Sequence, residues 1–147
     1  MEVTARHLGG SKFEVAARSH RIVCDQPEEN GGTDEGMTPP EFMLASLATC
    51  AGYYAAQYLK VRSLTTDLLT VHVNAEKAQR PARLGSFQID VTAPGLDARH
   101  EEGLLRAVKA CLIHNTLLGL PEIQVSVNPI PVTSLQSISG PTLGAGA

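Results

Sequence analysis

The sequence predicts an α+β domain with a mainly antiparallel sheet and a long central helix. Several short segments alternate apolar and polar residues with a period of two, which is typical of half-buried strands. Residues 42–59 carry no charge and are apolar on all sides, which favours a helix at the centre of the fold. The strands precede, separate and follow two helices instead of alternating with them, so the order is α+β.

The first strands lie at residues 13–17 and 22–24, where Phe13, Val15 and Ile22 alternate with polar side chains. They predict a short N-terminal hairpin. Residues 25–35 follow with five acidic residues, no base, Pro27 and the pair Gly31-Gly32. This composition predicts a solvated loop between the hairpin and the central helix.

A strong start signal for the central helix follows at Thr38-Pro39-Pro40-Glu41. Thr38 suits the N-cap, Pro39 suits the first helical position, and Glu41 can close a capping box. We expect this helix to run to about Leu59. Its small and mildly polar residues predict packing on several sides within a folded domain, and argue against a membrane span.

Two half-buried strands are predicted at residues 69–74 and 87–92, with the polar segment 76–85 joining them as a hairpin. Asp97 can cap a second helix whose apolar stripe includes Leu104, Val108 and Cys111. A last strand is predicted at 123–128, where Ile123 and its apolar neighbours alternate with polar residues. Residues 1–130 are thus expected to form one domain, and 131–147, rich in Ser, Gly, Pro and Thr, a flexible tail.

Composition excludes several classes of function. A net charge of -3 over 147 residues, without a basic run, argues against nucleic-acid binding. The three cysteines form no CxxC pair, which argues against a disulfide framework and a structural zinc site. No cofactor or metal is expected. The charged N-terminus lacks the apolar stretch of a secretory signal, so we expect a cytoplasmic protein without membrane attachment.

Cys50 and Cys111 are the candidate reactive residues. Two helical thiols that meet across a helix pair can form and break a disulfide, which suits peroxide reduction or thiol exchange. Buried cysteines also pack as small hydrophobes, and this alternative stays open for both residues. Cys24, on a strand, is expected to be a core residue. His114 follows Cys111 by three residues, where it can act as a base or make a structural hydrogen bond.

Four segments resemble the OsmC/Ohr superfamily. They are HRIVCDQP at 20–27, Gly31-Gly32, MTPPEFMLASLATC at 37–50, and CLIHNTL at 111–117. The order and spacing are similar over roughly residues 10–128. The resemblance implies an α+β intertwined homodimer that reduces organic hydroperoxides without metal or flavin. It also implies that Cys50 attacks the peroxide, that Cys111 resolves the product, and that a small or lipoyl-type dithiol returns the electrons.

The sequence departs from the family at the activating cation. Peroxide-reducing members hold an arginine against the reactive sulfur through a glutamate, and the loop at 25–38 contains no arginine. Arg18 and Arg21 on the hairpin are the remaining candidates, and Glu41 resembles the glutamate but equally suits the capping box. Leu112 stands where close relatives usually carry proline, so the helix need not break after Cys111.

Three functions therefore remain open. The first is a thiol peroxidase that acts on organic hydroperoxides through Cys50 and Cys111. The second is a non-catalytic dimer that binds a hydrophobic small molecule in an interface cavity, which the missing loop arginine favours. The third is a hydrolase or transferase in which His114 activates Cys50, and this requires the two side chains to come within hydrogen-bonding reach.

Overall fold

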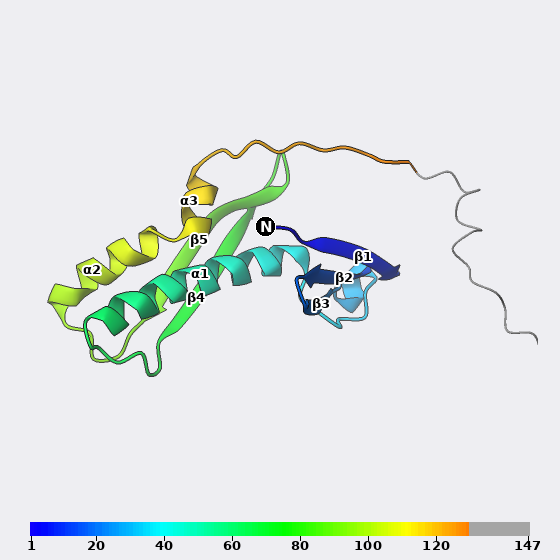
Figure 1. Cartoon of the computed structure of the whole chain (residues 1–147). Helices are drawn as coiled ribbons and strands as arrows, with labels where there is room; N and C mark the ends of the chain where they lie inside the picture. Colours follow the sequence, from blue (N-terminus) through cyan, green and yellow to red (C-terminus); the bar gives the residue numbers. More distant parts are fainter. Residues whose placement is uncertain (130–147) are drawn as a thin grey trace, which may run out of the picture.

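The computed structural model describes residues 1–129 and contains two antiparallel sheets and three α-helices (Figure 1). The elements are, in order, β1 (Thr4–Gly9), β2 (Lys12–Ala17), β3 (His20–Cys24), the 3-10 turn η1 (Glu28–Asn30), α1 (Pro39–Val61), β4 (Thr70–Ala78), β5 (Arg83–Thr92), α2 (Ala98–Lys109) and α3 (Leu112–Leu118). The predicted α+β class, antiparallel pairing and long helix are confirmed.

The N-terminal sheet has three strands in the order β1-β2-β3, one more than predicted. Strand β1 is exposed along its whole length, so its sequence lacks the alternation that reveals half-buried strands. Gly9 and Gly10, both with positive φ, form the turn into β2. Arg18 also has a positive φ, of 56°, in the turn between β2 and β3.

Helix α1 begins where predicted, after the N-cap residue Thr38, and ends at Val61. The Glu41 carboxylate closes the capping box by accepting hydrogen bonds from the Thr38 amide at 2.7 Å and its hydroxyl at 2.8 Å. Buried residues recur at every fourth position of the helix and form one stripe, which comprises Leu47, Ala51, Ala55 and Leu59. The opposite side is open in the single chain, where Tyr53 is 62% exposed, so packing on several sides is not seen.

The core lies between α1, the hairpin β4–β5 and α2. Val71 and Val91 are paired neighbours on the two strands and pack against the core. The residues on either side of each valine along its strand are exposed. Helix α2 approaches α1 closely at Gly103, where a Cβ atom would lie 2.1 Å from the Tyr58 hydroxyl. The N-terminal sheet, to the right of this core in Figure 1, makes only marginal contact with it.

The second predicted helix is two helices, because the chain breaks between Lys109 and Leu112. Side chains of α3 satisfy the last carbonyl groups of α2 at this break. His114 Nδ1 lies 2.9 Å from the Lys109 carbonyl oxygen, and the Asn115 amide lies 3.4 Å from that of Ala110. Cys111 is the N-cap of α3, with an extended ψ of 133°. The expectation of a continuous helix around Cys111 was therefore wrong.

The predicted last strand at 123–128 is not formed in the single chain. The segment is extended but pairs with neither sheet, and Ile123, Val125 and Val127 are more than 80% exposed. In Figure 1 it runs along the top of the view, away from the core. Alternation shows that a segment suits a sheet, but not which strand it joins.

Two further predictions concern the ends and the environment of the chain. The predicted flexible tail, 131–147, lies outside the described residues. Among residues 1–129, no helix has both the length and the hydropathy that a bilayer crossing requires.

Candidate functional site

The structure brings Cys50 and Cys111 together from distant parts of the sequence. Cys50 lies on α1, one turn after the buried Leu47, and is partly buried. Cys111 lies at the break between α2 and α3 and is fully buried. The Cys50 side chain lies close enough to Cys111 to shift its pKa, and neither cysteine is in a disulfide. The pair therefore has the proximity that reversible disulfide formation requires.

Cys111 is held in its thiol form. Burial raises the pKa of this thiol, and the neighbouring Cys50 thiol raises it further. The backbone N–H groups of His114 and Ile113 oppose this shift by favouring the thiolate, and His114 N lies 3.5 Å from the Cys111 sulfur. Because the net pKa shift is upward, Cys111 is poorly suited to begin an attack that requires a thiolate.

A largely apolar cavity of about 730 Å³ is lined by neighbours of the thiol pair in the sequence, although neither cysteine is part of its wall. Leu47 and Val108, which precede Cys50 and Cys111 by three residues, are part of its wall, and His114 lines it as well. Phe87 and Ile89 of β5 form the facing side. The volume lies in the range that accommodates small organic ligands.

The family model described as OsmC-like protein matches residues 32–126, which include both cysteines of the pair. The chain belongs to the OsmC family. No curated protein sequence matches it. The predicted membership of the OsmC/Ohr superfamily is thereby confirmed.

Solved structures show the same fold as this OsmC-like protein. An osmotic stress induced and detoxification response protein from Psychrobacter arcticus 273-4 is 19% identical, with a TM-score of 0.71 over 78% of this chain and 85% of that one. An OsmC-like protein from Mycoplasma pneumoniae is 22% identical, with a TM-score of 0.68 over 81% and 87%. The organic hydroperoxide resistance protein OhrB of Bacillus subtilis is 23% identical, with a TM-score of 0.52 over 80% and 90%.

The three other predicted site residues lie on the N-terminal sheet and at the start of α1. Arg21 forms an ion pair with Glu14 at 3.2 Å, and Arg18 is exposed in the turn before β3. Glu41 is engaged in the capping box with Thr38. Among residues 1–129, no hydrogen bond or ion pair joins either arginine to Glu41 or to a thiol of the pair.

The third cysteine, Cys24, is 7% exposed and ends β3, where its backbone bridges to Met37. It is a buried residue, as its alternation predicted. It is not hydrogen-bonded to the Cys50–Cys111 pair in the described structure. Cys24 is therefore a natural internal control for the reactivity of the pair.

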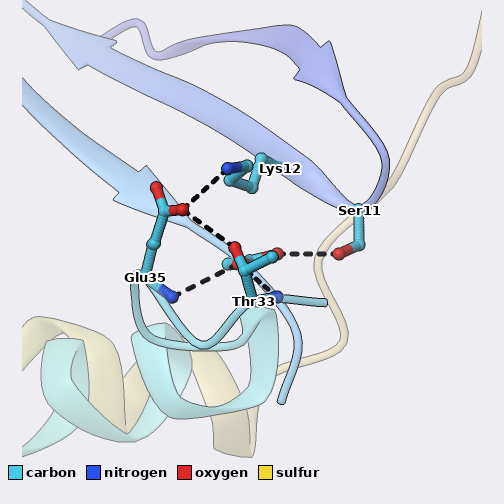
Figure 2. A network of polar contacts seen from close by, with 5 residues as sticks. Ser11, Lys12, Thr33 and Glu35 are labelled. Atoms are coloured by element: carbon cyan, nitrogen blue, oxygen red, sulfur yellow. Dashed lines mark hydrogen bonds and ion pairs between the residues drawn. The ribbon is translucent and has the colours of Figure 1, made fainter. Parts of the chain in front are cut away.

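Asp25, in contrast, is not solvated as its acidic loop predicted, but fully buried. Figure 2 shows the network around it. One carboxylate oxygen accepts a hydrogen bond from the Ser11 hydroxyl at 2.7 Å, and the other accepts from the amides of Thr33 and Glu35 at 3.0 and 3.2 Å. The Ser11 hydrogen bond, with further backbone donors, lowers the pKa of Asp25 strongly against the effect of burial.

The network ties the loop before α1 to the N-terminal sheet. Lys12 of β2 pairs with Glu35 of the loop at 2.8 Å, and the Thr33 hydroxyl bridges Glu35 and Asp25. The loop approaches itself closely at Gly32, where a Cβ atom would lie 1.8 Å from the Gln26 carbonyl oxygen. Only glycine therefore fits at this position. Asp25 directly follows a strand and precedes Pro27 and the pair Gly31-Gly32. This position is the sequence signal that could have indicated its structural role.

Side chains that could hold a metal ion do not cluster in the described part of the chain. Among residues 1–129, no group of three or more His, Cys, Asp and Glu side chains is arranged to hold a metal ion. The reactive side chains that the structure brings together at this site are the two adjoining thiols.

Proposed function

We propose that this OsmC-like protein reduces organic hydroperoxides with Cys50 and Cys111. The Cys50 thiolate attacks the terminal oxygen of the hydroperoxide, an S–O bond forms and the O–O bond breaks. The released alkoxide takes up a proton and leaves as the alcohol, and Cys50 becomes a sulfenic acid. The Cys111 thiol then condenses with the sulfenic acid, which forms the disulfide and releases water. A dithiol reductant restores both thiols and is itself oxidised to a disulfide.

The observation that supports this proposal is that the fold brings Cys50 close enough to Cys111 to shift its pKa. The assignment of roles follows from their surroundings. Cys111 is fully buried and has a raised pKa, which suits a thiol that waits for a sulfenic acid. Cys50 is partly exposed, which suits the residue that meets the peroxide first. Several solved structures of the same fold are named organic hydroperoxide resistance proteins.

A nearby cation would stabilise the thiolate of the partly buried Cys50, and the proposal assigns this role to Arg18 or Arg21. In the superfamily that this sequence resembles, an arginine held by a glutamate faces the reactive sulfur, and Glu41 is the candidate glutamate. Arg21 would have to exchange its ion pair with Glu14 for one at the site. An exposed ion pair of this kind contributes little stability, so the exchange costs little.

We further propose that the protein acts as a homodimer. The N-terminal sheet makes only marginal contact with the core and exposes Phe13 and Ile22. One side of α1 is uncovered, and the segment at 123–127 exposes alternating apolar side chains without a partner strand. A second copy would cover these surfaces and supply the missing strand pairing. We place the reaction in the cytoplasm, where thiols are kept reduced.

The direct test is consumption of cumene hydroperoxide in the presence of a dithiol such as dihydrolipoamide. We expect the wild type and Cys24→Ser to turn over at similar rates. Cys50→Ser should abolish turnover, and Cys111→Ser should reduce it severely because the sulfenic acid then over-oxidises. Equal rates in Cys50→Ser and wild type would refute the proposal.

One observation favours a second candidate, a non-catalytic protein that binds an apolar small molecule. The cavity of about 730 Å³ is large, while the thiol pair has no cation bonded to it in the described residues. This candidate predicts ligand binding without peroxide turnover, and the same assay separates the two.

A further inference from the structure

The break between α2 and α3 fixes the proton position on the His114 ring. His114 Nδ1 lies 2.9 Å from the Lys109 carbonyl oxygen. A carbonyl oxygen can only accept, so Nδ1 must carry the proton and donate it. In the neutral ring, Nε2 is then a bare acceptor. Within residues 1–129, the ring makes no other hydrogen bond.

His114 also lines the large cavity, whose other polar wall residues have their own partners. Arg83 donates to the Pro81 carbonyl at 3.3 Å and Gln88 donates to Asp90 at 2.9 Å. Ser86 lies 3.5 Å from the Glu76 carboxylate. Arg83, Ser86 and Gln88 are thus each engaged with a neighbour, whereas His114 Nε2 has no hydrogen-bond partner among residues 1–129.

We infer that His114 is a ligand-binding residue, whose Nε2 accepts a hydrogen bond from the hydroxyl or hydroperoxide group of an apolar molecule in the cavity. The walls formed by Leu47, Phe87 and Val108 take the hydrocarbon part of the molecule. An acceptor next to these apolar residues favours a ligand with an O–H donor over a hydrocarbon. Because His114 follows Cys111 by three residues, this contact directs the O–H end of the ligand toward the thiol pair.

The identity of the ligand as a hydroperoxide and its alcohol product rests on the proposed function, whereas the His114 contact is tested by binding alone. Two probes differ only in the group at issue: 2-phenylpropan-2-ol, the alcohol formed from cumene hydroperoxide, and cumene, which lacks the hydroxyl. Binding of each to the reduced full-length protein is measured by calorimetry or NMR titration.

The informative variant is His114→Asn. An asparagine amide can still donate to the Lys109 carbonyl in place of Nδ1, but offers nothing in place of Nε2. We expect it to bind the alcohol about fivefold more weakly and cumene unchanged, as for loss of one neutral hydrogen bond. His72→Asn is the matched control, since His72 is exposed on β4 and does not line the cavity. It should bind both probes as the wild type does.

Three results would overturn the inference. The first is an unchanged affinity of His114→Asn for the alcohol, and the second is a loss of affinity for cumene equal to that for the alcohol. The third is that the wild type binds the carboxylate 2-methyl-2-phenylpropanoate more tightly than the alcohol, which would assign recognition to Lys109. The wild type provides a test independent of folding in the variant, because ¹⁵N NMR of the imidazole must show Nδ1 protonated and Nε2 bare. If alcohol binding depends on His114 but the protein does not turn over peroxide, the proposed function is rejected and this inference stands. If the protein turns over peroxide but alcohol binding does not depend on His114, this inference is rejected and the proposed function stands.

Discussion

The Cys111 thiol at the start of α3 adjoins the Cys50 thiol on α1, which raises the pKa of Cys111. The break between α2 and α3 makes this contact possible, because it places Cys111 at an extended N-cap position instead of within a continuous helix. The contact also separates the roles of the two residues. The pKa of Cys111 is raised by burial and by Cys50, whereas Cys50 is the more exposed of the two.

Replacement of Asp25 should destabilise the N-terminal part of the fold. Asp25→Asn puts an amide NH₂ where a carboxylate oxygen now accepts hydrogen bonds, so donors from Ser11, Thr33 or Glu35 lose their acceptor. We expect the midpoint of thermal unfolding to fall by roughly 5 °C. Asp34→Asn is the control, since Asp34 lies in the same loop but is exposed. Equal midpoints for the two variants would show that the network contributes no stability.

The same carboxylate predicts a pH dependence of stability. The pKa of Asp25 is lowered in the folded state from its ordinary value of 3.8. Its contribution is therefore fully present above that value and is lost as the pH falls below it. Urea unfolding from pH 6 to pH 3 should show a steeper loss of stability in the wild type than in Asp25→Asn. Parallel curves would contradict this assignment.

If an arginine activates Cys50, alkylation kinetics should identify it. Removal of the cation favours the thiol over the thiolate, so the rise of the iodoacetamide rate with pH should move about one pH unit higher. We expect this in only one of Arg18→Ala and Arg21→Ala. Arg6→Ala is the control, because Arg6 lies on the same sheet and also contacts Glu14. Unchanged profiles in both hairpin variants would remove the arginines from the mechanism.

The dimer is tested by sedimentation. We expect a species of about twice 15.6 kDa at micromolar concentration. Val125→Lys should weaken association about tenfold, because a charge replaces a side chain expected to be buried. Ser126→Lys, on the opposite side of the same extended segment, should have little effect. A wild type that sediments only as a monomer would contradict the dimer.

The parts of the fold that sequence predicted are those with a strong local signal. The capping box at Thr38 and Glu41 marked the start of α1, and alternation around Val71 and Val91 marked β4 and β5. Strand β1 was missed because none of its residues is buried. The segment around Val125 has the alternation of a strand but finds no partner in the single chain.

The details of the candidate site depend on tertiary contacts that spacing does not reveal. The apolar stripe that includes Cys111 predicted one continuous helix, and the break depends on His114 and Asn115 reaching back to α2. Asp25 stood in an acidic loop and looked solvated, but the loop folds over it and supplies its donors. Such hydrogen bonds join residues whose side chains meet only after the chain has folded.

The most direct test of the central claim counts the three thiols after addition of about one equivalent of an organic hydroperoxide. Peptide mass spectrometry should show a Cys50–Cys111 disulfide with Cys24 still free. In Cys111→Ser, Cys50 should instead accumulate as sulfenic and then sulfinic acid. A wild type that forms no Cys50–Cys111 disulfide, or whose three thiols react slowly and without order, would contradict the two-cysteine mechanism.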